Sequence, residues 1–516
     1  MSASLVPERT GARVVLPSEE DPVVAGAAVA LGGAPGRHSR LGRQGLWTPV
    51  RWIVLLTLVA SLFGWWQKSP CRVHAWADEY QYTRGCYSDV FALYGAERLN
   101  EGKVPYLQHP VEYPVVIGAV MLVASESVQL LDPTVRNRHF YDVTWALLTA
   151  CAVVVAVTTA RLAGRRRPWD AAMFAAAPLL VLHGSTNWDL AAMAVAGLGL
   201  VQWARSRPLA AGVLLGVATA TKLFPVLFLV PLLALALRAG KLRAWAVTAA
   251  AVVLTPVLLS LPVYLSSPYF VGGTTQVVAA SPLERLGSEG LSALAPKVTT
   301  TVDGLPVVGA NAAYRFFDLN TSRPADWDSL WFVLQKARGD VPLDSGPGAP
   351  ELLNRGVLVA FVLALAGIVA LVLLAPRRPR LGQVLFLTVL AFLLTNKVWS
   401  PQFSLWLLPL VVLARPRWRS VLAWQAAEAL VLFTRFYFFV SFPAGEGDPT
   451  EGIDVGWFIG AVLLRDAVLV AIAALVVRDV LQPERDVVRR EDLVDDPMGG
   501  VLDRAPDRRQ VSGAPR

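Results

Sequence analysis

Long apolar runs dominate this chain and constrain its fold more than any other feature. Most of them are ~14 to 25 residues long, which suits helices that cross a bilayer, with the shorter runs tilted or irregular at one end. They lie near residues 47–67, 140–162, 169–184, 188–204, 209–221, 223–238, 243–265, 352–375, 381–395, 402–414, 418–440 and 455–477. Because 54% of the residues are hydrophobic and only 17% are charged, the composition is typical of membrane proteins. The sequence predicts an all-α polytopic membrane protein with about twelve transmembrane helices.

Arginine clusters at the ends of these runs set the expected topology. If the twelve runs cross and the N-terminus is inside, every cluster falls on the cytoplasmic side, as the positive-inside rule requires. The clusters are residues 165–167, 205–207, 238–243, 377–380, 415–419 and Arg478. Topology therefore explains the net charge of +8 without a nucleic-acid partner. Both termini are expected in the cytoplasm.

One further apolar run, Val115–Leu131, does not fit this count. It is interrupted by Ser125, Glu126 and Ser127, so a re-entrant or interfacial segment is expected, and a thirteenth crossing stays open.

The chain divides into three regions by composition. Residues 1–45 lack helical periodicity and are expected to form a disordered cytoplasmic tail. Residues 46–478 form the multi-span membrane domain, with a first outer loop at 68–114 and a long outer loop at 266–351. Residues 479–516 alternate Arg with Asp and Glu and are expected to form a second disordered, charged cytoplasmic tail. Neither tail is expected to carry the chemistry.

The first outer loop concentrates carboxylates next to apolar runs. Its carboxylates are Asp78, Glu79, Asp89, Glu97, Glu101 and Glu112. Asp89 is the best candidate for a general base; the alternatives are an exposed loop carboxylate or a helix N-cap. Glu112 has a similar alternative as a loop residue. Cys71 and Cys86 lie in the same loop, and a disulfide between them stays open if the loop is outside.

Three short polar connections, 183–189, 221–225 and 396–402, fall on the same outer side. Asp189 either lines a cavity or caps a helix. Lysine is rare, with 7 Lys against 40 Arg, yet Lys222 and Lys397 both occur in these connections. A compact ammonium there suits a phosphate or pyrophosphate, and the alternative is a lysine that snorkels to the headgroups.

The stretch Ser400–Trp406 combines a Ser-Pro helix start with an amide and aromatic rings. Gln402 is suited to sugar hydroxyls, and Trp406 to stacking on a sugar face or a lipid chain. An aromatic belt at the membrane interface has the same appearance in sequence.

The sequence contains little evidence for a metal or cofactor site. His74, Asp78, Glu79, Asp89, His109 and Glu112 are possible ligands in one loop, but they lack a regular ligand spacing. We therefore expect that no metal or other cofactor is required, and a divalent metal has only these unspaced ligands in its favour. No nucleotide-binding or redox motif stands in a suitable setting.

Six motifs occur in an order that resembles the GT-C membrane glycosyltransferases. The resemblance is closest to glycosyltransferase family 87, the polyprenyl-phosphate-mannose-dependent mannosyltransferases. The motifs are SDVFALY (88–94), GKVPY (102–106), EYP (112–114), NWD (187–189), TKLFP (221–225) and NKVWSPQF (396–403).

The resemblance implies a GT-C-like fold in the plasma membrane with an extracytoplasmic catalytic loop. It implies Asp89 as the base, and we predict Glu112 as a second catalytic carboxylate. The predicted substrate-binding residues are Tyr94, Tyr113, Asp189, Lys222, Lys397, Ser400, Gln402 and Trp406. The implied reaction is inverting transfer of a hexose, mannose by the resemblance, from a polyprenyl-phosphate donor to an envelope glycan or glycolipid. The sequence departs from the family after Tyr113, where EYPVV replaces a double proline, and the long outer loop has no matching motif.

Two other classes of protein are compatible with the sequence. A transporter or flippase of a lipid-linked envelope precursor predicts charges near the bilayer midplane and an inverted repeat. We find no such repeat, and the polar motifs cluster at the outer edge. A membrane scaffold for envelope assembly is the third possibility.

Overall fold

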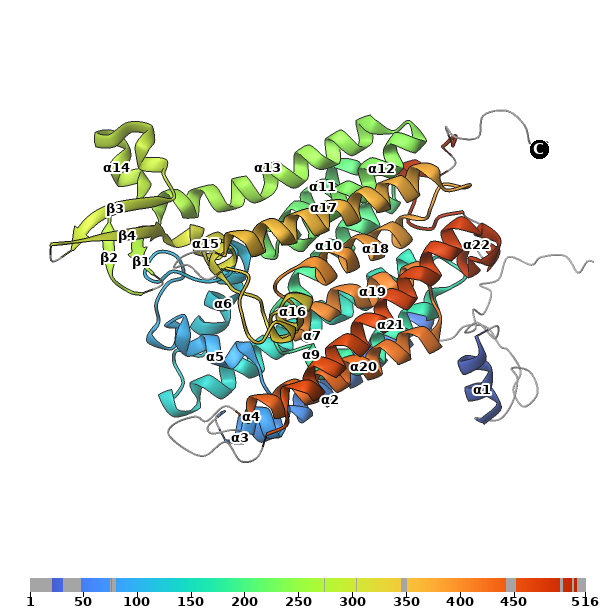
Figure 1. Ribbon diagram of the computed structural model, residues 1–516, viewed down its shortest axis with the longest axis horizontal. Coiled ribbons are helices and arrows are strands. Elements are labelled where there is room, and N and C mark those ends of the chain that lie inside the picture. The colour runs from blue at the N-terminus through green and yellow to red at the C-terminus, as the bar shows by residue number, and fades with distance from the viewer. Residues whose placement is uncertain are drawn as a thin grey trace, which may run out of the picture.

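A bundle of long helices lying roughly side by side forms the body of the molecule (Figure 1). The computed structural model describes residues 21–30, 48–74, 76, 80–272, 274–302, 304–344, 350–441, 452–491, 495–503 and 505–507. The helices of the bundle are α2 (Pro49–Gln67), α7 (Pro133–Leu162), α10 (Asp189–Ala204), α11 (Pro208–Thr221), α12 (Leu229–Ala239), α13 (Leu242–Ser266), α17 (Glu351–Leu374), α18 (Leu381–Thr395), α19 (Ser404–Ala414), α20 (Trp418–Phe439) and α21 (Val455–Leu481).

Shorter helices connect or flank the bundle. The α-helices among them are α1 (Pro22–Ala30), α3 (Ser69–Val73), α4 (Tyr80–Thr83), α5 (Asp89–Ala96), α6 (Val115–Glu126), α8 (Ala172–Ala175), α9 (Pro178–His183), α14 (Pro282–Glu289), α15 (Arg315–Ser322), α16 (Leu330–Ala337) and α22 (Val487–Glu491). The 3-10 helices are η1 (Leu99–Glu101), η2 (Pro168–Ala171), η3 (Phe224–Phe228), η4 (Gly290–Leu294), η5 (Ala312–Tyr314), η6 (Pro401–Phe403), η7 (Pro483–Arg485) and η8 (Gly500–Leu502).

Five helices in the described part of the chain are long and apolar enough to cross a membrane: α2, α7, α13, α17 and α21. These make the chain a membrane protein. The other apolar runs form helices of 10–17 residues in several cases, α10, α11 and α18 among them. At ~1.5 Å per residue such a helix is shorter than the ~30 Å hydrocarbon core. The count of about twelve crossings therefore stays a prediction.

The predicted run 169–184 is not one helix. The structure breaks it into η2, α8 and α9, and α9 begins at Pro178. Proline lacks an N–H and disfavours a helical residue before it, so the preceding helix ends there. The residues after α9 turn back into the protein, where they reach the first outer loop.

The helices at the periphery of the bundle are more exposed than those at its centre. Only 6% of the apolar stretch of α17 and 17% of that of α13 are buried, against 50% for α7. Apolar helices exposed on most sides face lipid when the protein lies in a membrane. At the contact between α11 and α13, Gly212 and Gly216 lie against the backbone of Thr248 and Ala251, where a Cβ would collide. This small-residue spacing lets two membrane helices approach closely.

The long outer loop corrects the all-α prediction. It contains a four-stranded antiparallel sheet in the order β2-β1-β4-β3, made of β1 (Tyr269–Val271), β2 (Val277–Ala279), β3 (Lys297–Val302) and β4 (Leu305–Asn311). The sequence carries a signal for the hairpin that the all-α prediction overlooks: β3 reads KVTTTV, and the turn to β4 contains Gly304 at φ +78°. A run of β-branched residues before such a turn is typical of a hairpin. The protein is thus mostly helical.

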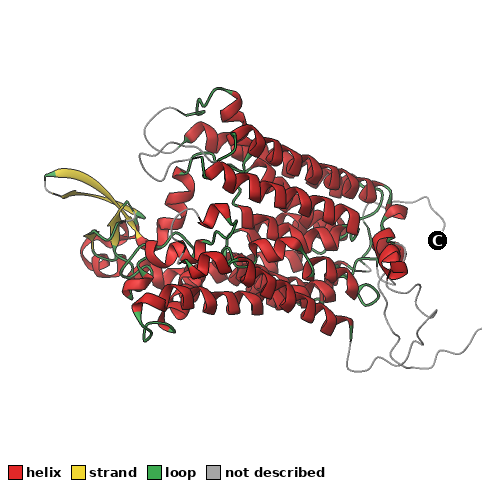
Figure 2. Ribbon diagram, turned by 90° about the horizontal axis from the view of Figure 1, so that it is seen from below, coloured by secondary structure: helices red, strands yellow, loops and turns green. Residues whose placement is uncertain are grey.

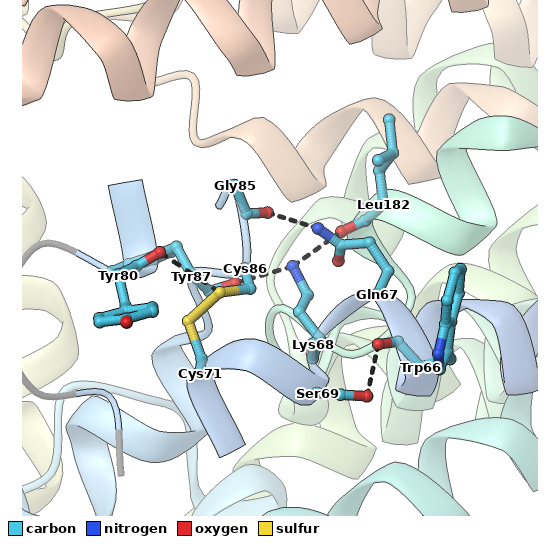
Figure 3. The surroundings of a disulfide bond; sticks show 10 residues. All are labelled: Trp66, Gln67, Lys68, Ser69, Cys71, Tyr80, Gly85, Cys86, Tyr87 and Leu182. Atoms are coloured by element: carbon cyan, nitrogen blue, oxygen red, sulfur yellow. Dashed lines mark hydrogen bonds between the residues drawn. A yellow bond between two sulfur atoms is a disulfide. The ribbon is translucent and has the colours of Figure 1, made fainter. Parts of the chain in front are cut away.

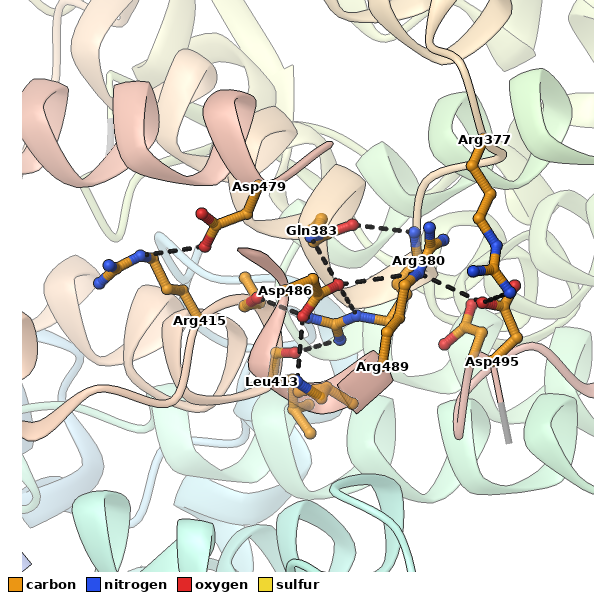
Figure 4. A network of polar contacts seen from close by, with 12 residues as sticks. Arg377, Arg380, Gln383, Leu413, Arg415, Asp479, Asp486, Arg489 and Asp495 are labelled. Carbon is orange, nitrogen blue, oxygen red and sulfur yellow. Dashed lines mark hydrogen bonds and ion pairs between the residues drawn. The ribbon is translucent and has the colours of Figure 1, made fainter. Parts of the chain in front are cut away.

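The C-terminal tail is a second correction, because the described part of 479–516 is folded. The helix α21 extends to Leu481, and α22 and η8 follow. Asp486 pairs with Arg380 at 2.6 Å (Figure 4). Met498 and Leu502 are buried in the core. The charge alternation that suggested disorder instead supplies partners for arginines at the ends of the helices. Residues 492–494, 504 and 508–516 lie outside the described residues.

The predicted N-terminal tail also contains structure where it is described. The helix α1 lies within it, and the Oδ2 of Asp21 accepts from the N–H of Trp418 at 3.1 Å. The rest of the predicted tail, 1–20 and 31–45, lies outside the described residues.

The two ends of the bundle differ in what they carry. Both views place the sheet at one end and the C-terminal segment at the other (Figure 1, Figure 2). The helices α3, α4 and α5 of the first outer loop lie at the same end as the sheet (Figure 1). The polar connections therefore meet at one end of the bundle.

Candidate active site

The first outer loop is fixed to the bundle at its beginning (Figure 3). A disulfide joins Cys71 to Cys86, which answers the question that the sequence left open. The ammonium of Lys68, directly after α2, donates to the carbonyls of Tyr87 at 2.9 Å and Leu182 at 3.2 Å. These contacts hold residues 87–89 at the end of the bundle, beside α9.

Asp89 begins α5 and is held by backbone and side-chain contacts. Its N–H donates to the carbonyl of Thr186 at 2.9 Å, so it adjoins the connection before α10. Its Oδ1 accepts from the hydroxyl of Tyr87 at 2.5 Å. Its Oδ2 accepts from Asn187 at 2.7 Å and from Gln402 at 3.3 Å. A carboxylate has about four acceptor positions, so a substrate hydroxyl can still approach it.

A cavity of about 420 Å³ opens in front of Asp89. Of the predicted site residues, Asp89, Ser400 and Gln402 line it. Its other walls come from regions far apart in the sequence: the first loop, α9, the stretch 323–327 of the long outer loop, and α20. The cavity has the size and the mixed polar and aromatic lining of a small-molecule site.

A second polar layer lies behind the cavity. Asp189 is fully buried; it pairs with Lys222 at 2.8 Å and accepts from the indole of Trp406 at 2.7 Å. The Nδ2 of Asn187 donates to the hydroxyl of Tyr113 at 2.6 Å as well as to Asp89. The structure therefore brings Tyr113, Asp189, Lys222 and Trp406 together next to Asp89, but away from the cavity lining.

Three predicted residues lie elsewhere. Lys397 donates to the carbonyls of Arg323 at 2.6 Å and Thr321 at 3.2 Å, so its ammonium holds the long outer loop. Tyr94 is buried and stacks on Phe140.

The third, Glu112, is half-buried and pairs with Arg323 at 3.2 Å, behind the cavity wall. Burial raises the pKa of Glu112, and the guanidinium of Arg323 opposes this shift.

Several residues of the cavity were not predicted from the sequence. Tyr87 donates to Asp89, and burial together with that carboxylate raises the pKa of its hydroxyl, so Tyr87 remains a donor. Lys68 and Arg323 line the cavity and bring positive charge to it. The rarity of lysine applies to Lys68 as well, but its place directly after the first apolar run suggests a role in topology.

The possible metal ligands of the first outer loop do not gather into a site where they are described. In the described part of the chain no group of three or more His, Cys, Asp or Glu side chains is placed to hold a metal ion. Of the loop ligands named from sequence, Asp78 and Glu79 lie outside the described residues.

The structure thus has an apolar helix bundle and, at one end of it, a cavity lined by a hydrogen-bonded carboxylate. This arrangement suits a membrane protein that acts on a small polar molecule at one face of the membrane. The chain matches the model of glycosyltransferase family 87 over residues 113–401. That match covers more than half of the chain, and the protein belongs to this family. It is therefore a membrane glycosyltransferase, with a sugar donor and an acceptor as its substrates, rather than a transporter or a scaffold.

A search of curated proteins gives no match. The family match begins at Tyr113 and ends at Pro401, so Asp89, Gln402 and Trp406 lie outside it. The case for these three residues rests on their geometry and on the motifs that carry them.

Proposed function

We propose that the protein transfers a hexose, mannose in the simplest case, from a polyprenyl-phosphate sugar to a glycan or glycolipid on the outer face of the plasma membrane. The observation that carries the proposal is the carboxylate of Asp89, held by Tyr87, Asn187 and Gln402 at the floor of the cavity. Those donors come from three separate parts of the chain, and such positioning is what a general base needs.

The reaction follows from this arrangement. The acceptor hydroxyl attacks C1 of the sugar, and its proton passes to the carboxylate of Asp89. The bond between C1 and the phosphate oxygen breaks, and the electron pair leaves with the polyprenyl phosphate. Attack opposite to the leaving group inverts the configuration at C1. The phosphate is an adequate leaving group, so the proposed chemistry requires no metal.

Two features support the outer face. Disulfides persist in oxidising compartments, and the bond between Cys71 and Cys86 lies in the loop that carries Asp89. Arginines such as Arg238, Arg380 and Arg415 lie at the opposite end of the bundle, with the C-terminal segment. The positive-inside rule places that end in the cytoplasm.

The test is transfer of labelled mannose from polyprenyl-phosphate mannose to endogenous lipids in membranes. We expect Asp89→Asn to lower the rate by about 10²- to 10⁴-fold at normal protein level, because the amide cannot accept the proton. Asp326→Asn is the matched control, since Asp326 also lines the cavity but its Oδ1 accepts from the N–H of Trp327. Transfer that survives Asp89→Asn would remove Asp89 as the base.

Stereochemistry gives a second test. The anomeric configuration of the product, determined by NMR, should be opposite to that of the donor. A product with retained configuration, or a trapped glycosyl-enzyme, would contradict the single displacement.

A further inference from the structure

Positive charge at the cavity comes from residues other than the two lysines singled out in the sequence. Lys222 is neutralised by Asp189, and Lys397 is occupied by backbone carbonyls. Among the cations that line the cavity, Arg435 is paired with the fully buried Asp328 at 2.8 Å. This leaves Lys68, whose acceptors are backbone carbonyls, and Arg323, whose pair with Glu112 is partly exposed and uses one N–H, as the cations best able to meet a ligand.

Lys68 is a buried ammonium held by neutral groups. Its side chain is 1% exposed, and its two hydrogen-bond acceptors are the backbone carbonyls of Tyr87 and Leu182. An ammonium has three N–H donors, so one remains. Burial lowers the pKa of Lys68 to about 7, although the charge of Asp89 acts in the opposite direction. A buried cation held by carbonyls is stabilised when an anion enters the cavity beside it.

Arg323 approaches the cavity from the long outer loop. Its side chain is 38% exposed, and one guanidinium N–H donates to Glu112 at 3.2 Å. The backbone on both sides of it is fixed: Lys397 donates to its carbonyl, and the N–H of Asp326 donates to the carbonyl of Lys397 at 2.7 Å. A guanidinium has five N–H donors in a planar fork that suits phosphate oxygens. The loop therefore presents a positioned cation with donors to spare.

The rest of the lining indicates that the ligand is not a free anion. Leu432, Phe436 and Phe439 on α20 line the same cavity, together with Tyr82 of α4. On the same helix, Phe433 and Tyr437 are exposed, at 45% and 42%, so the apolar side chains of α20 continue from the cavity to the surface of the protein. A charged cavity next to an apolar wall that continues to the protein surface fits a molecule with a phosphate and a hydrocarbon chain.

We propose that Lys68 and Arg323 form the binding site for the phosphate of a lipid phosphate, with its hydrocarbon chain against Leu432, Phe436 and Phe439. The inference rests on the proposed function in one respect only, which is that the lipid phosphate is part of the sugar donor and is released as a product. Lys397 and Glu112 are then positioning residues, since they hold Arg323 and the loop that carries it. The carboxylates of Asp89 and Asp326 face the same cavity and leave the two cations as the place for the phosphate.

The experiment measures binding, so it does not depend on transfer. Purified full-length protein in detergent is titrated with geranylgeranyl phosphate, geranylgeraniol or inorganic phosphate, and thermal stabilisation gives an apparent affinity. The variants are Arg323→Gln and Lys68→Met. Lys297→Gln is the control, because Lys297 pairs with Asp318 on the sheet-bearing loop, away from the cavity lining.

We expect geranylgeranyl phosphate to bind intact protein and Lys297→Gln equally, and at least tenfold more weakly to Arg323→Gln and Lys68→Met. Geranylgeraniol and inorganic phosphate should each bind far more weakly than the lipid phosphate. Undiminished binding to Arg323→Gln would overturn the site even if Lys68→Met fails to fold, because Arg323 is partly exposed. Equal binding of the alcohol would overturn the phosphate contact, and equal binding of inorganic phosphate would overturn the apolar wall.

Failure of the proposed function has a different signature. If intact protein binds geranylgeranyl phosphate but does not transfer mannose from polyprenyl-phosphate mannose, the lipid-phosphate site stands and the assignment of the sugar donor fails.

Discussion

The two ends of the helix bundle treat buried charge differently. At the end with the C-terminal segment, Arg380 is satisfied by Asp486 and by the carbonyls of Leu413 and Ala414 (Figure 4). Arg238 is paired with Asp507, and Arg415 with Asp479.

At the other end, Asp89, Lys68 and Arg323 line a cavity and retain unused donors or acceptors. Charges that satisfy one another hold helices together, whereas charges around a cavity are available to a ligand. Substitutions of these charged residues should accordingly affect stability at the C-terminal end and catalysis or ligand binding at the cavity end.

The largest expected effect is on stability at the C-terminal end. Asp486→Ala leaves the buried guanidinium of Arg380 without its carboxylate, and breaking a buried pair costs ~3–5 kcal/mol. The melting temperature and the membrane level should fall strongly, while transfer per folded molecule stays within about twofold. The control is Glu484→Ala, because Glu484 lies in the adjacent η7 and is exposed. If Asp486→Ala kept normal stability but lost transfer, charges at the C-terminal end would also serve catalysis, contrary to the comparison.

Removal of the disulfide should act at the cavity end through stability. The bond closes a separation of 15 residues, and the loop-entropy model gives about 3 kcal/mol for such a loop. Cys71→Ser should lower the melting temperature, and reductant should destabilise the intact protein to a similar extent. Cys151→Ser is the control, since Cys151 is a free thiol in α7. If Cys71→Ser had the melting temperature of the intact protein, the remaining contacts of the loop would be enough to stabilise it.

Tyr87→Phe sharpens the comparison by removing one donor to Asp89 without changing the shape of the cavity. A hydrogen bond to a charged group contributes ~1.5–3 kcal/mol, so kcat/KM should fall by about 10- to 100-fold at normal protein level. Tyr80→Phe, in the same loop, should be neutral. An unchanged kcat/KM in Tyr87→Phe would mean that Tyr87 does not position the base.

The smallest expected effect is on the pH dependence of phosphate binding. Burial lowers the pKa of Lys68 to about 7, in a cavity that Asp89, His183 and Arg435 also line. A bound phosphate favours the charged ammonium, so above pH 7 binding requires uptake of a proton and weakens as the pH rises. Between pH 7 and pH 8 the apparent affinity for geranylgeranyl phosphate should fall by about fivefold.

The lipid phosphate does not itself produce this change. Its second ionisation is near pH 6, so its charge is nearly constant in this range. Arg323→Gln should keep the pH dependence and Lys68→Met should lose it. A steady affinity from pH 7 to pH 9 in intact protein would exclude Lys68 as the titrating group.

Much of the helical framework was predictable from local sequence. The runs 209–221 and 381–395 become α11 (Pro208–Thr221) and α18 (Leu381–Thr395). Prolines mark the first residue of α2, α7 and α11, where the missing N–H costs nothing. The β3–β4 hairpin was overlooked although its signal is local, whereas the pairing of β1 with β4 and of Asp486 with Arg380 joins residues far apart in the chain and was not predictable.

The candidate site shows the same division. The motifs that carry Asp89, Asp189 and Gln402 were found in the sequence, because polar residues at the ends of apolar runs are unusual and short-range patterns reveal them. Which of them would face the cavity was not predictable. Lys222 and Lys397 have similar settings in sequence, yet one meets Asp189 and the other meets the long loop.

The sequence by itself determined that the chain is a membrane protein, where its helices run, and which polar connections gather on one side, since these follow from local hydrophobicity and charge. Only the tertiary structure decided which charges neutralise one another and which remain open to a ligand. Arg323 lies far from Lys68 and Asp89 in the chain, and their common cavity depends on how α2, α9, α20 and the long outer loop pack together. The two partners of an ion pair are close in space but can be far apart in the sequence, so the packing of the helices and loops decides which charges meet.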